Sequence, residues 1–332
     1  MAMTGTPGVS VVMTFFDAQA FLHDAIRSVV AQTYERWELL LVDDGSTDGS
    51  ARIAREWMAR YPGRMTYLAH AGHANRGISA ARNLGLRHAS AEFVAFLDAD
   101  DVWYRDKLDR QVALLRAHPE AAMVYGRTQY WYSWTGKPED VARDHVPPHR
   151  FPADAVVTPP KLVTAFVRGS AAVPCICSVL VRRSLLVRLA GFEESFPGLY
   201  EDQVLYTKVC LGAPVFVSDE CLERYRQHPG SVCATAERSD AQAIWRARYL
   251  RWLSRYVAEA DVVDRDLSRA LRTERWIWDG ADTSALPRPA QRLVRRAKQA
   301  LVWPFALFSR RGKRRSRSGG VGPRDGGITT CA

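Results

Sequence analysis

Acidic residues are grouped in the sequence at a spacing that could hold a metal ion. The run FLDADD contains Asp98 and Asp100, two residues apart, with Asp101 beside them. Carboxylate oxygens suit Mg²⁺ or Mn²⁺, which commonly keep waters and take phosphate oxygens as further ligands. A metal held in this way can neutralise a departing diphosphate. A D-x-D pattern alone is equally compatible with acids that cap the following helix or line a solvated loop.

A second segment carries groups that favour phosphate. ANRGISAARNLGL places Arg76 and Arg82 on either side of a predicted helix start at Gly77. Backbone N–H groups at a helix N-terminus and guanidinium groups both bind anions. The two groups together indicate a site for a phosphorylated ligand.

The elements that must position these residues alternate along the chain. Near-continuous apolar strands lie between amphipathic helical segments, which predicts a parallel α/β sheet covered on both faces. The predicted strands are residues 9–16, 37–42, 65–69, 93–97, 122–125 and 178–181, and the predicted helices are 18–32, 49–61 (capped from Ser46, Thr47 or Asp48), 77–89, 107–117, 161–168, 183–190 and 202–211. Residues 131–160 read as a long loop, which is usually functional.

This order places acids at the ends of two strands. Asp43 and Asp44 follow the second strand, and Asp98, Asp100 and Asp101 follow the fourth. Ligands of such sheets bind beyond the carboxyl ends of the strands. Grouped carboxylates repel one another unless a cation or hydrogen-bond donors meet them, so the pattern favours a divalent metal.

The positive charge of the chain is concentrated near its C-terminus. The formal net charge is +10, but residues 288–324 contain twelve Lys or Arg and no acid, and the rest of the chain has 34 basic and 36 acidic residues. The rest of the chain is therefore near neutral. The basic segment indicates contact with an anionic surface, and a membrane face more than a nucleic acid.

The cysteines and the N-terminal segment bear on the cellular compartment in which the protein is expected. The six cysteines form neither a C-x-x-C pair nor a zinc-finger spacing with His, so no zinc module or disulfide scaffold is predicted. Two of them, Cys175 and Cys177, precede a predicted strand and look buried. The first residues lack the pattern of a signal peptide, and no stretch reaches the ~20 apolar residues that span a bilayer. We expect a cytoplasmic protein.

Three long segments in this order resemble the family-two glycosyltransferases, which are inverting enzymes with the GT-A fold. VSVVMTFFDAQAFLHDAIRSVVAQTYERWELLLVDDGSTDGS is similar to their opening nucleotide-binding segment. NRGISAARNLGLRHASAEFVAFLDADDVWYRDKL is similar to their central D-x-D segment, and YEDQVLYTKVCLGAPVFVSDECLERYRQHPGSV to their catalytic-base segment and closing strands. The resemblance covers residues 9–232, roughly two-thirds of the chain.

The resemblance implies a set of donor-binding residues. Thr14 and Asp44 match positions that contact the nucleoside, with Asp44 bonded to the base ring. Arg82 matches a position near the diphosphate or nucleoside, and Asp98 matches the acid that faces the ribose and donor sugar. The commonest donor in the family is a uridine diphosphate sugar, although thymidine and guanosine diphosphate sugars fit the same motifs.

The resemblance also implies the metal ligand and the base. Asp100 matches the ligand of Mn²⁺ or Mg²⁺, and Asp202 in YEDQ matches the general base that deprotonates the acceptor hydroxyl. Glu201 is its structural or orienting neighbour. His228 is either a further metal ligand or a turn residue before Pro229. One base and one metal suffice for an inverting transfer, whereas a glycosidase needs two flanking carboxyl groups.

The implied fold is α/β: a GT-A, Rossmann-like mixed sheet, mostly parallel, with helices on both faces and a C-terminal helical extension. Residues 1–8 form an N-terminal tail and 9–233 the GT-A domain, with a nucleotide-sugar-binding half at 9–125 and an acceptor and base half at 126–233. Residues 234–308 form the extension, which ends in an amphipathic basic helix, and 309–332 a disordered basic tail.

The implied activity is transfer of a sugar from a nucleoside diphosphate sugar to a glycan or lipid-linked acceptor, in cell-surface polysaccharide synthesis. A nucleotidyltransferase would need a glycine-rich loop after the first strand, and FFDAQAF has none. A further alternative is a catalytically weak scaffold that binds a membrane or nucleic acid through its basic tail. Residues 288–317 either lie on the inner face of an anionic membrane or pack on the domain with a solvated tail.

Overall fold

The structure is a computed structural model that describes residues 6–237 and 241–278. Its N-terminal half is a parallel β-α-β series in which β1 pairs with β2 and β4, and β2 pairs with β3. The elements are β1 (Val9–Phe15), α1 (Leu22–Val30), β2 (Trp37–Asp43), α2 (Ser50–Arg60), β3 (Met65–Ala69), η1 (Ala71–His73), α3 (Ile78–His88) and β4 (Phe93–Asp98).

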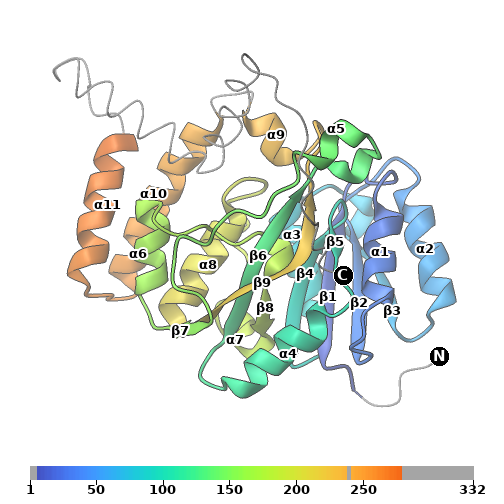
Figure 1. The fold of residues 1–332 in the computed structure, drawn as a ribbon, viewed down its shortest axis with the longest axis horizontal. Coiled ribbons are helices and arrows are strands. Elements are labelled where there is room, and N and C mark those ends of the chain that lie inside the picture. Colours follow the sequence, from blue (N-terminus) through green and yellow to red (C-terminus); the bar gives the residue numbers. More distant parts are fainter. Residues whose placement is uncertain (1–5, 238–240, 279–332) are drawn as a thin grey trace, which may run out of the picture.

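The second half of the chain continues the same sheet (Figure 1). The strand order is β3-β2-β1-β4-β8-β6-β9-β5, with β7 also paired to β9. Pairing is antiparallel from β4 to β8 to β6, and parallel again between β6 and β9. The elements are β5 (Val102–Trp103), α4 (Lys107–Ala117), β6 (Met123–Trp131), η2 (Ser133–Thr135), α5 (Pro138–Val141), β7 (Ala155–Val157), α6 (Lys161–Arg168), η3 (Ile176–Ser178), β8 (Leu180–Arg182), α7 (Arg183–Arg188), α8 (Glu201–Gly212) and β9 (Val215–Arg226).

Alternate residues of the central strands enter two separate cores. Val11 and Met13 of β1 face the core that contains residues of α1, α2 and α4. Val12 of β1, with Val94 and Phe96 of β4, faces the core that contains residues of α3, α6, α8, α10 and α11. This two-residue alternation is the geometry of a strand covered on both sides. The predicted α/β fold with a mixed sheet and helices on both faces is confirmed.

Helices follow the sheet at the C-terminal end of the described chain. They are α9 (Val232–Glu237), α10 (Ala241–Glu259) and α11 (Arg265–Trp278), and α10 and α11 pack beside α6 and α8 at the left of Figure 1. Among the described residues, no helix has the length and apolar character needed to cross a bilayer. The predicted basic amphipathic helix and tail lie outside the described residues.

Several element boundaries differ from the sequence prediction for local reasons. The first helix begins at Leu22 instead of residue 18, because the segment from Ala18 forms a turn in which Ala18 C=O accepts the N–H groups of Phe21 and Leu22. Asp48 does accept the N–H of Ser50, at 2.9 Å, at the start of α2. The main differences are longer or additional strands: β6 extends to Trp131, and β5, β7 and the twelve-residue β9 had no predicted range.

A fully buried ion pair joins α4 to β9. Lys107 Nζ lies 3.0 Å from Glu223 Oε2, and neither side chain is exposed. Thr128 donates to the other oxygen of Glu223 at 2.8 Å. Burial raises the pKa of Glu223, and Lys107 and Thr128 oppose that shift. Because each charge depends on the other, loss of one leaves the second buried and unpaired.

We expect Lys107→Met to lower the free energy of unfolding by about 3–5 kcal/mol, because it leaves the Glu223 carboxylate buried without a cation. The double variant Lys107→Met/Glu223→Leu should recover much of that loss, since neither charge remains. Urea denaturation measures the stability of both variants. Lys137→Met, at an exposed position, is the control and should lie within ~0.5 kcal/mol of wild type. A single variant as stable as the control would contradict the assignment.

Candidate active site

The carboxyl ends of β1, β2 and β4 bring the predicted donor-binding residues to one edge of the sheet. Thr14 is opposite Val42 on one neighbouring strand and opposite Asp98 on the other. The next residue of β1 is opposite Asp43. Parallel pairing therefore places Thr14 between the two acidic strand ends, where ligands of such sheets bind.

The two aspartates after β2 hold the loops of this edge. Both oxygens of Asp44 accept backbone N–H groups, from Arg76 at 2.8 Å and from Gly77 at 2.9 Å. Gly77 has a φ of 84°, and a Cβ there would lie 2.9 Å from the carbonyl oxygen of Pro197, so the turn requires glycine. Asp44 thereby fixes the start of α3, and its contact with a nucleoside stays a prediction.

Asp43 is completely buried, and both of its carboxylate oxygens have hydrogen-bond partners. It accepts hydrogen bonds from Ser46 N–H and Tyr67 O–H, both at 2.8 Å, and lies 3.1 Å from Nε2 of His73. Burial alone would raise the pKa of Asp43, but these hydrogen bonds outweigh burial and lower it. The group is therefore an ionised anchor for the loop that carries Asp44.

Arg82 of α3 connects the donor edge to the segment with the predicted base. It is 1% exposed, and its guanidinium group lies 2.7 Å from Asp98 Oδ1 and 3.0 Å from Glu201 Oε1. Burial disfavours its charge, but the two carboxylates prevail and raise its pKa. Burial raises the pKa of Asp98, with Arg82 opposing and Asp100 adding to the shift. Arg82 thus holds both acids at fixed positions.

The side chain of His228 contacts Asp100, the second aspartate of the D-x-D. Its Nε2 lies 2.9 Å from Asp100 Oδ2, and both side chains are partly exposed. Arg226 donates its Nε–H to the carbonyl of Asp100 at 2.7 Å and its backbone N–H to Asp101 at 3.0 Å. The structure thereby joins the end of β9 to the loop after β4.

The pair Asp100 and His228 fits a divalent metal. A carboxylate oxygen and a ring nitrogen converge, partly open to solvent, and two protein ligands leave positions for phosphate oxygens and waters. The neighbouring charges add to the fit, because Asp100 and Glu201 both raise the pKa of Asp98. A cation would relieve that repulsion.

Asp202 lies in the first turn of α8, beside the Arg82 bridge. Burial, and then the charge of Glu201, raise its pKa to about 7, while Arg82 opposes the shift. One oxygen accepts the N–H of Gln203 at 2.6 Å. A carboxylate with a pKa near 7 can accept a proton at neutral pH and is a stronger base than an ordinary aspartate.

An aromatic wall, formed by Phe21, Trp131 and Trp134, surrounds Arg226. The Arg226 guanidinium carbon lies 4.8, 4.6 and 5.3 Å from these three ring centres. Trp134 also contacts His228 edge-on and donates its Nε1–H to Gln227 C=O at 2.9 Å. Arg226 is therefore buried among rings, and the start of the predicted loop at 131–160 is anchored over His228.

Sequence reasoning missed part of this site. It did not find the contacts of Arg226 with Asp100 and Asp101, nor Phe21, whose ring lies 4.7 Å from that of His228. It gave Cys175 and Cys177 no role beyond being buried before a strand, although they lie beside Asp101. The C-x-C spacing was a visible signal, but its partner is more than seventy residues earlier in the chain.

Comparison with known proteins identifies the class and then the family. The fold is the GT-A fold: the structure of S. aureus TarS 1-349 in complex with UDP-GlcNAc aligns with a TM-score of 0.64 at 19% identity, over 87% of this chain and 79% of that one. The family model described as glycosyl transferase family 2 matches residues 10–185, just over half of the chain. The chain belongs to that family.

Relatives of known name differ in how much they share. A Bacillus subtilis protein named as a teichuronic acid biosynthesis glycosyltransferase, TuaG, is 28% identical over 251 residues, 74% of this chain and 86% of TuaG. Mannosyltransferase PcManGT from Pyrobaculum calidifontis, solved with GDP-Man and Mn²⁺, aligns with a TM-score of 0.55 at 21% identity, over 92% of this chain and 84% of that one. Three further curated relatives, from B. subtilis, Escherichia coli and Nostoc, match over 122 residues or fewer, and the chain spans less than half of their length. The comparisons thus confirm the resemblance and give the scaffold alternative no support.

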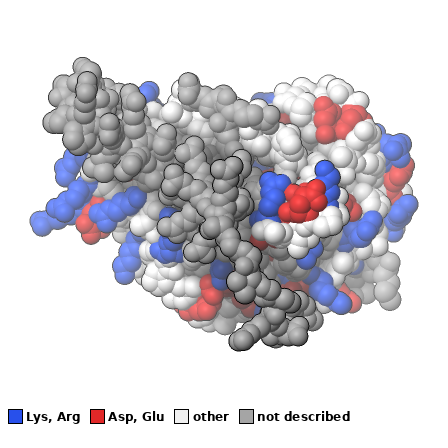
Figure 2. Space-filling view, turned by 45° about the horizontal axis from the view of Figure 1, so that its top comes forward, with Lys and Arg blue, Asp and Glu red and all other residues white. Residues whose placement is uncertain are grey.

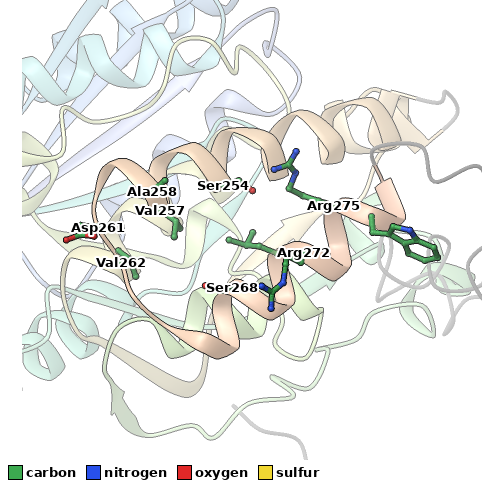
Figure 3. A pocket seen from close by; sticks show the side chains of 10 residues that line it. Ser254, Val257, Ala258, Asp261, Val262, Ser268, Arg272 and Arg275 are labelled. Atoms are coloured by element: carbon green, nitrogen blue, oxygen red, sulfur yellow. The ribbon is translucent and has the colours of Figure 1, made fainter.

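A separate hollow of about 610 Å³ lies between α10 and α11 (Figure 3). Its lining includes Val257, Leu271, Arg272 and the half-exposed Trp276. It contains none of the residues of the acidic edge, so the chemistry described above does not use it.

We expect Arg82→Met to destabilise the fold by about 3–5 kcal/mol and to weaken nucleoside diphosphate binding, because Asp98 and Glu201 then lose their shared cation. Arg82→Lys should recover part of the stability at most, since one ammonium cannot replace a forked guanidinium between two acids. Calorimetric titration with uridine diphosphate and thermal unfolding measure the two effects. The exposed Arg87→Met on the same helix is the control, and an effect equal to that control would contradict the bridging role.

Proposed function

We propose that this protein transfers a sugar, with inversion, from a nucleoside diphosphate sugar to a hydroxyl group of a glycan or lipid-linked acceptor. The observation that carries the proposal is Asp202, a carboxylate whose pKa is about 7 and which is linked through Glu201 and Arg82 to Asp98 of the D-x-D. An inverting transfer needs a base beside the acceptor hydroxyl and a site that stabilises the departing diphosphate on the opposite side of the sugar.

The donor lies along the carboxyl ends of β1, β2 and β4 in this proposal. Thr14 and Asp44 contact the nucleoside, Asp98 faces the ribose and sugar, and Arg82 holds Asp98 in place from beneath. A uridine diphosphate sugar is the first donor to test, since TarS has been solved with UDP-GlcNAc. PcManGT has been solved with GDP-Man, so a guanosine donor belongs in the same screen.

Asp100 and His228 are the residues that would hold Mn²⁺ or Mg²⁺. When bound, the metal offsets the negative charge that develops on the departing diphosphate. The support is the 2.9 Å approach of the two side chains and the Mn²⁺ in the PcManGT structure. Arg226 positions both, through the Asp100 carbonyl and through its ring contacts with Trp134.

Asp202 takes the proton of the acceptor hydroxyl as that oxygen attacks the anomeric carbon. Gln203 N–H holds one of its oxygens, which leaves the other for the acceptor. In this proposal one carboxylate acts as base and none as a nucleophile, so the sugar is transferred in a single displacement with inverted configuration. Glu201 does not share this work, since its oxygen pairs with Arg82.

The acceptor side is formed by the 131–160 loop and the C-terminal helices. Tyr200, the residue before Glu201, stacks on Tyr249 of α10 at 5.5 Å. The relative TuaG is named for teichuronic acid biosynthesis, and this chain matches 86% of it. A growing cell-surface polysaccharide or its lipid-linked precursor is therefore the acceptor class proposed.

We expect the release of nucleoside diphosphate to rise about tenfold per pH unit below pH 6 and to level off above pH 8, because Asp202 must lose its proton near pH 7 to act as base. Asp202→Asn should lower the rate by about 10²–10⁴ and abolish this pH dependence. The assay is a screen of donor sugars with Mn²⁺, followed by chromatography of the nucleotide product. A variant that kept the wild-type pH profile would contradict the assignment of the base.

Asp100→Ala is the matched variant that separates the metal site from the base. It should lose the Mn²⁺-dependent part of uridine diphosphate binding by calorimetry, whereas Asp202→Asn should bind the nucleotide as wild type does. If neither variant altered binding or turnover, and the protein instead bound RNA with a steep salt dependence, the scaffold alternative would replace this proposal.

The basic C-terminal segment belongs to the same proposal. In the view of Figure 2, acidic and basic side chains both occur on the described surface that is visible there. Residues 288–317 attach the protein to the anionic inner face of a membrane, at about 1 kcal/mol for each basic residue near the surface. Attachment would bring Asp202 close to a lipid-linked acceptor.

Deletion of residues 288–332 should abolish co-sedimentation with phosphatidylglycerol vesicles at low salt and leave donor hydrolysis unchanged. Pure phosphatidylcholine vesicles, which carry no net charge, are the control for both proteins. Equal sedimentation of the shortened and full chains would contradict the membrane role.

A further inference from the structure

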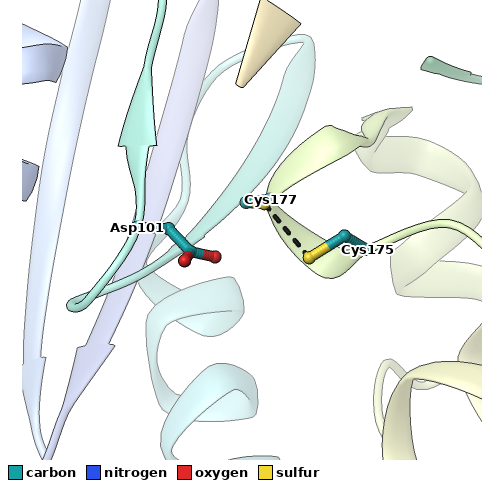
Figure 4. A group of neighbouring side chains, drawn as sticks. All are labelled: Asp101, Cys175 and Cys177. Atoms are coloured by element: carbon teal, nitrogen blue, oxygen red, sulfur yellow. Dashed lines mark hydrogen bonds between the residues drawn. The ribbon is translucent and has the colours of Figure 1, made fainter. Parts of the chain in front are cut away.

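Asp101, Cys175 and Cys177 form a cluster beside the D-x-D that the transfer chemistry does not use. Their ligand atoms all lie within 4.8 Å of one another. Figure 4 shows the carboxylate of Asp101, from the loop after β4, pointing toward the two sulfur atoms near η3. Two distant parts of the chain therefore present one oxygen and two sulfur ligands to the same small space.

One carboxylate oxygen of Asp101 is buried without a hydrogen-bond partner among the described residues. The side chain is 1% exposed, and Oδ1 accepts the backbone N–H of Arg226 at 3.0 Å. Oδ2 is the oxygen without a partner in the part of the chain that the structure describes. An unsatisfied buried acceptor costs about 1–3 kcal/mol, and more if charged, so a native fold normally provides a ligand for it.

The two cysteines are held in place, and one of them is partly exposed. Cys177 is fully buried, and its Sγ lies 3.2 Å from Sγ of Cys175, which is partly exposed. The Cys175 carbonyl accepts both N–H and O–H of Ser178, at 2.9 and 2.8 Å. The Cys177 carbonyl accepts Nε1–H of Trp103 at 2.9 Å. The backbone that carries both thiols is thus fixed before any ion binds.

We propose that Asp101, Cys175 and Cys177 bind a thiophilic divalent cation, Zn²⁺, at a site separate from Asp100 and His228. Thiolate sulfur selects zinc over Mg²⁺ and Mn²⁺. With Zn–S near 2.3 Å and Zn–O near 2.0 Å, tetrahedral ligands lie about 3.4–3.8 Å apart, so one ion can draw this cluster together with side-chain shifts of about 1 Å. Two Zn–S bonds form as the thiol protons pass to solvent, and water fills the fourth position.

The ion would act on the active site through positioning. It ties the segment before β8 to the loop after β4, one residue from Asp100. Asp101 also holds the backbone of Arg226, whose side chain holds the Asp100 carbonyl. Zinc at the cluster would therefore order Asp100 and Arg226 together, without touching donor or acceptor.

Cobalt is the probe, because Co²⁺ bound to thiolate gives a charge-transfer absorption that oxygen and nitrogen ligands do not. The full chain, reduced and freed of metal with a chelator, should bind one Co²⁺ per chain with that absorption, and Zn²⁺ should displace it. The double variant Cys175→Ser/Cys177→Ser should lose the absorption. Zinc should also raise the unfolding temperature of wild type and leave that of the double variant unchanged.

Two variants separate this site from its neighbours. Asp100→Ala removes the other metal ligand and should keep the thiolate absorption, and Cys210→Ser, which removes a buried cysteine outside the cluster, should keep it too. Absorption that persists in the double variant would overturn the proposal. So would a wild-type protein without the absorption, whether its two thiols are free or joined in a disulfide under the reducing conditions used.

Discussion

The site depends on one buried cation, Arg82, placed between two carboxylates. Asp98 comes from the end of β4 and Glu201 from the first turn of α8, so the guanidinium group joins the parallel half of the sheet to the helix that carries Asp202. Without that charge, the acids would repel one another in a region that solvent screens poorly. The rise in the pKa of Asp202 reflects the balance between burial, Glu201 and Arg82. Arg82 therefore acts both on the packing of these acids and on the pKa of Asp202.

Around Asp100 and His228, the buried cation is Arg226, and its surroundings differ from those of Arg82. Arg226 is buried, and its guanidinium group contacts aromatic faces, a backbone oxygen and, at 3.5 Å, the carboxylate of Asp24. Burial lowers the pKa of Arg226, and Asp24, Asp100 and Asp101 oppose that shift. This arrangement holds His228 against Asp100 without consuming the carboxylate oxygens that a metal needs. The two arginines thus divide the work, since Arg82 neutralises acids and Arg226 positions them.

Local patterns in the sequence were sufficient for the order of strands and helices in the first half, because β1 to β4 are apolar runs separated by amphipathic helices. They also located Asp44, Asp98 and Asp100, since strand ends of a parallel sheet converge. The pairing of Arg82 with Glu201 spans 119 residues and has no local signal. The resemblance implied closing strands in the segment of β9 but not their bounds, because β9 carries charged residues such as Glu223, whose burial depends on the distant cation Lys107.

The stacking of Tyr200 on Tyr249 gives the C-terminal helices a part in the evolution of the enzyme. Tyr200 adopts a left-handed backbone conformation, with φ of 65°, at the point where α8 begins. A non-glycine residue in that conformation needs support from its surroundings, and α10 supplies it. Substitutions along α10 can therefore shift Asp202, two residues after Tyr200, while every acid of the motif stays the same. Acceptor preference could diverge among relatives through a helix that carries none of the family's recognised motifs.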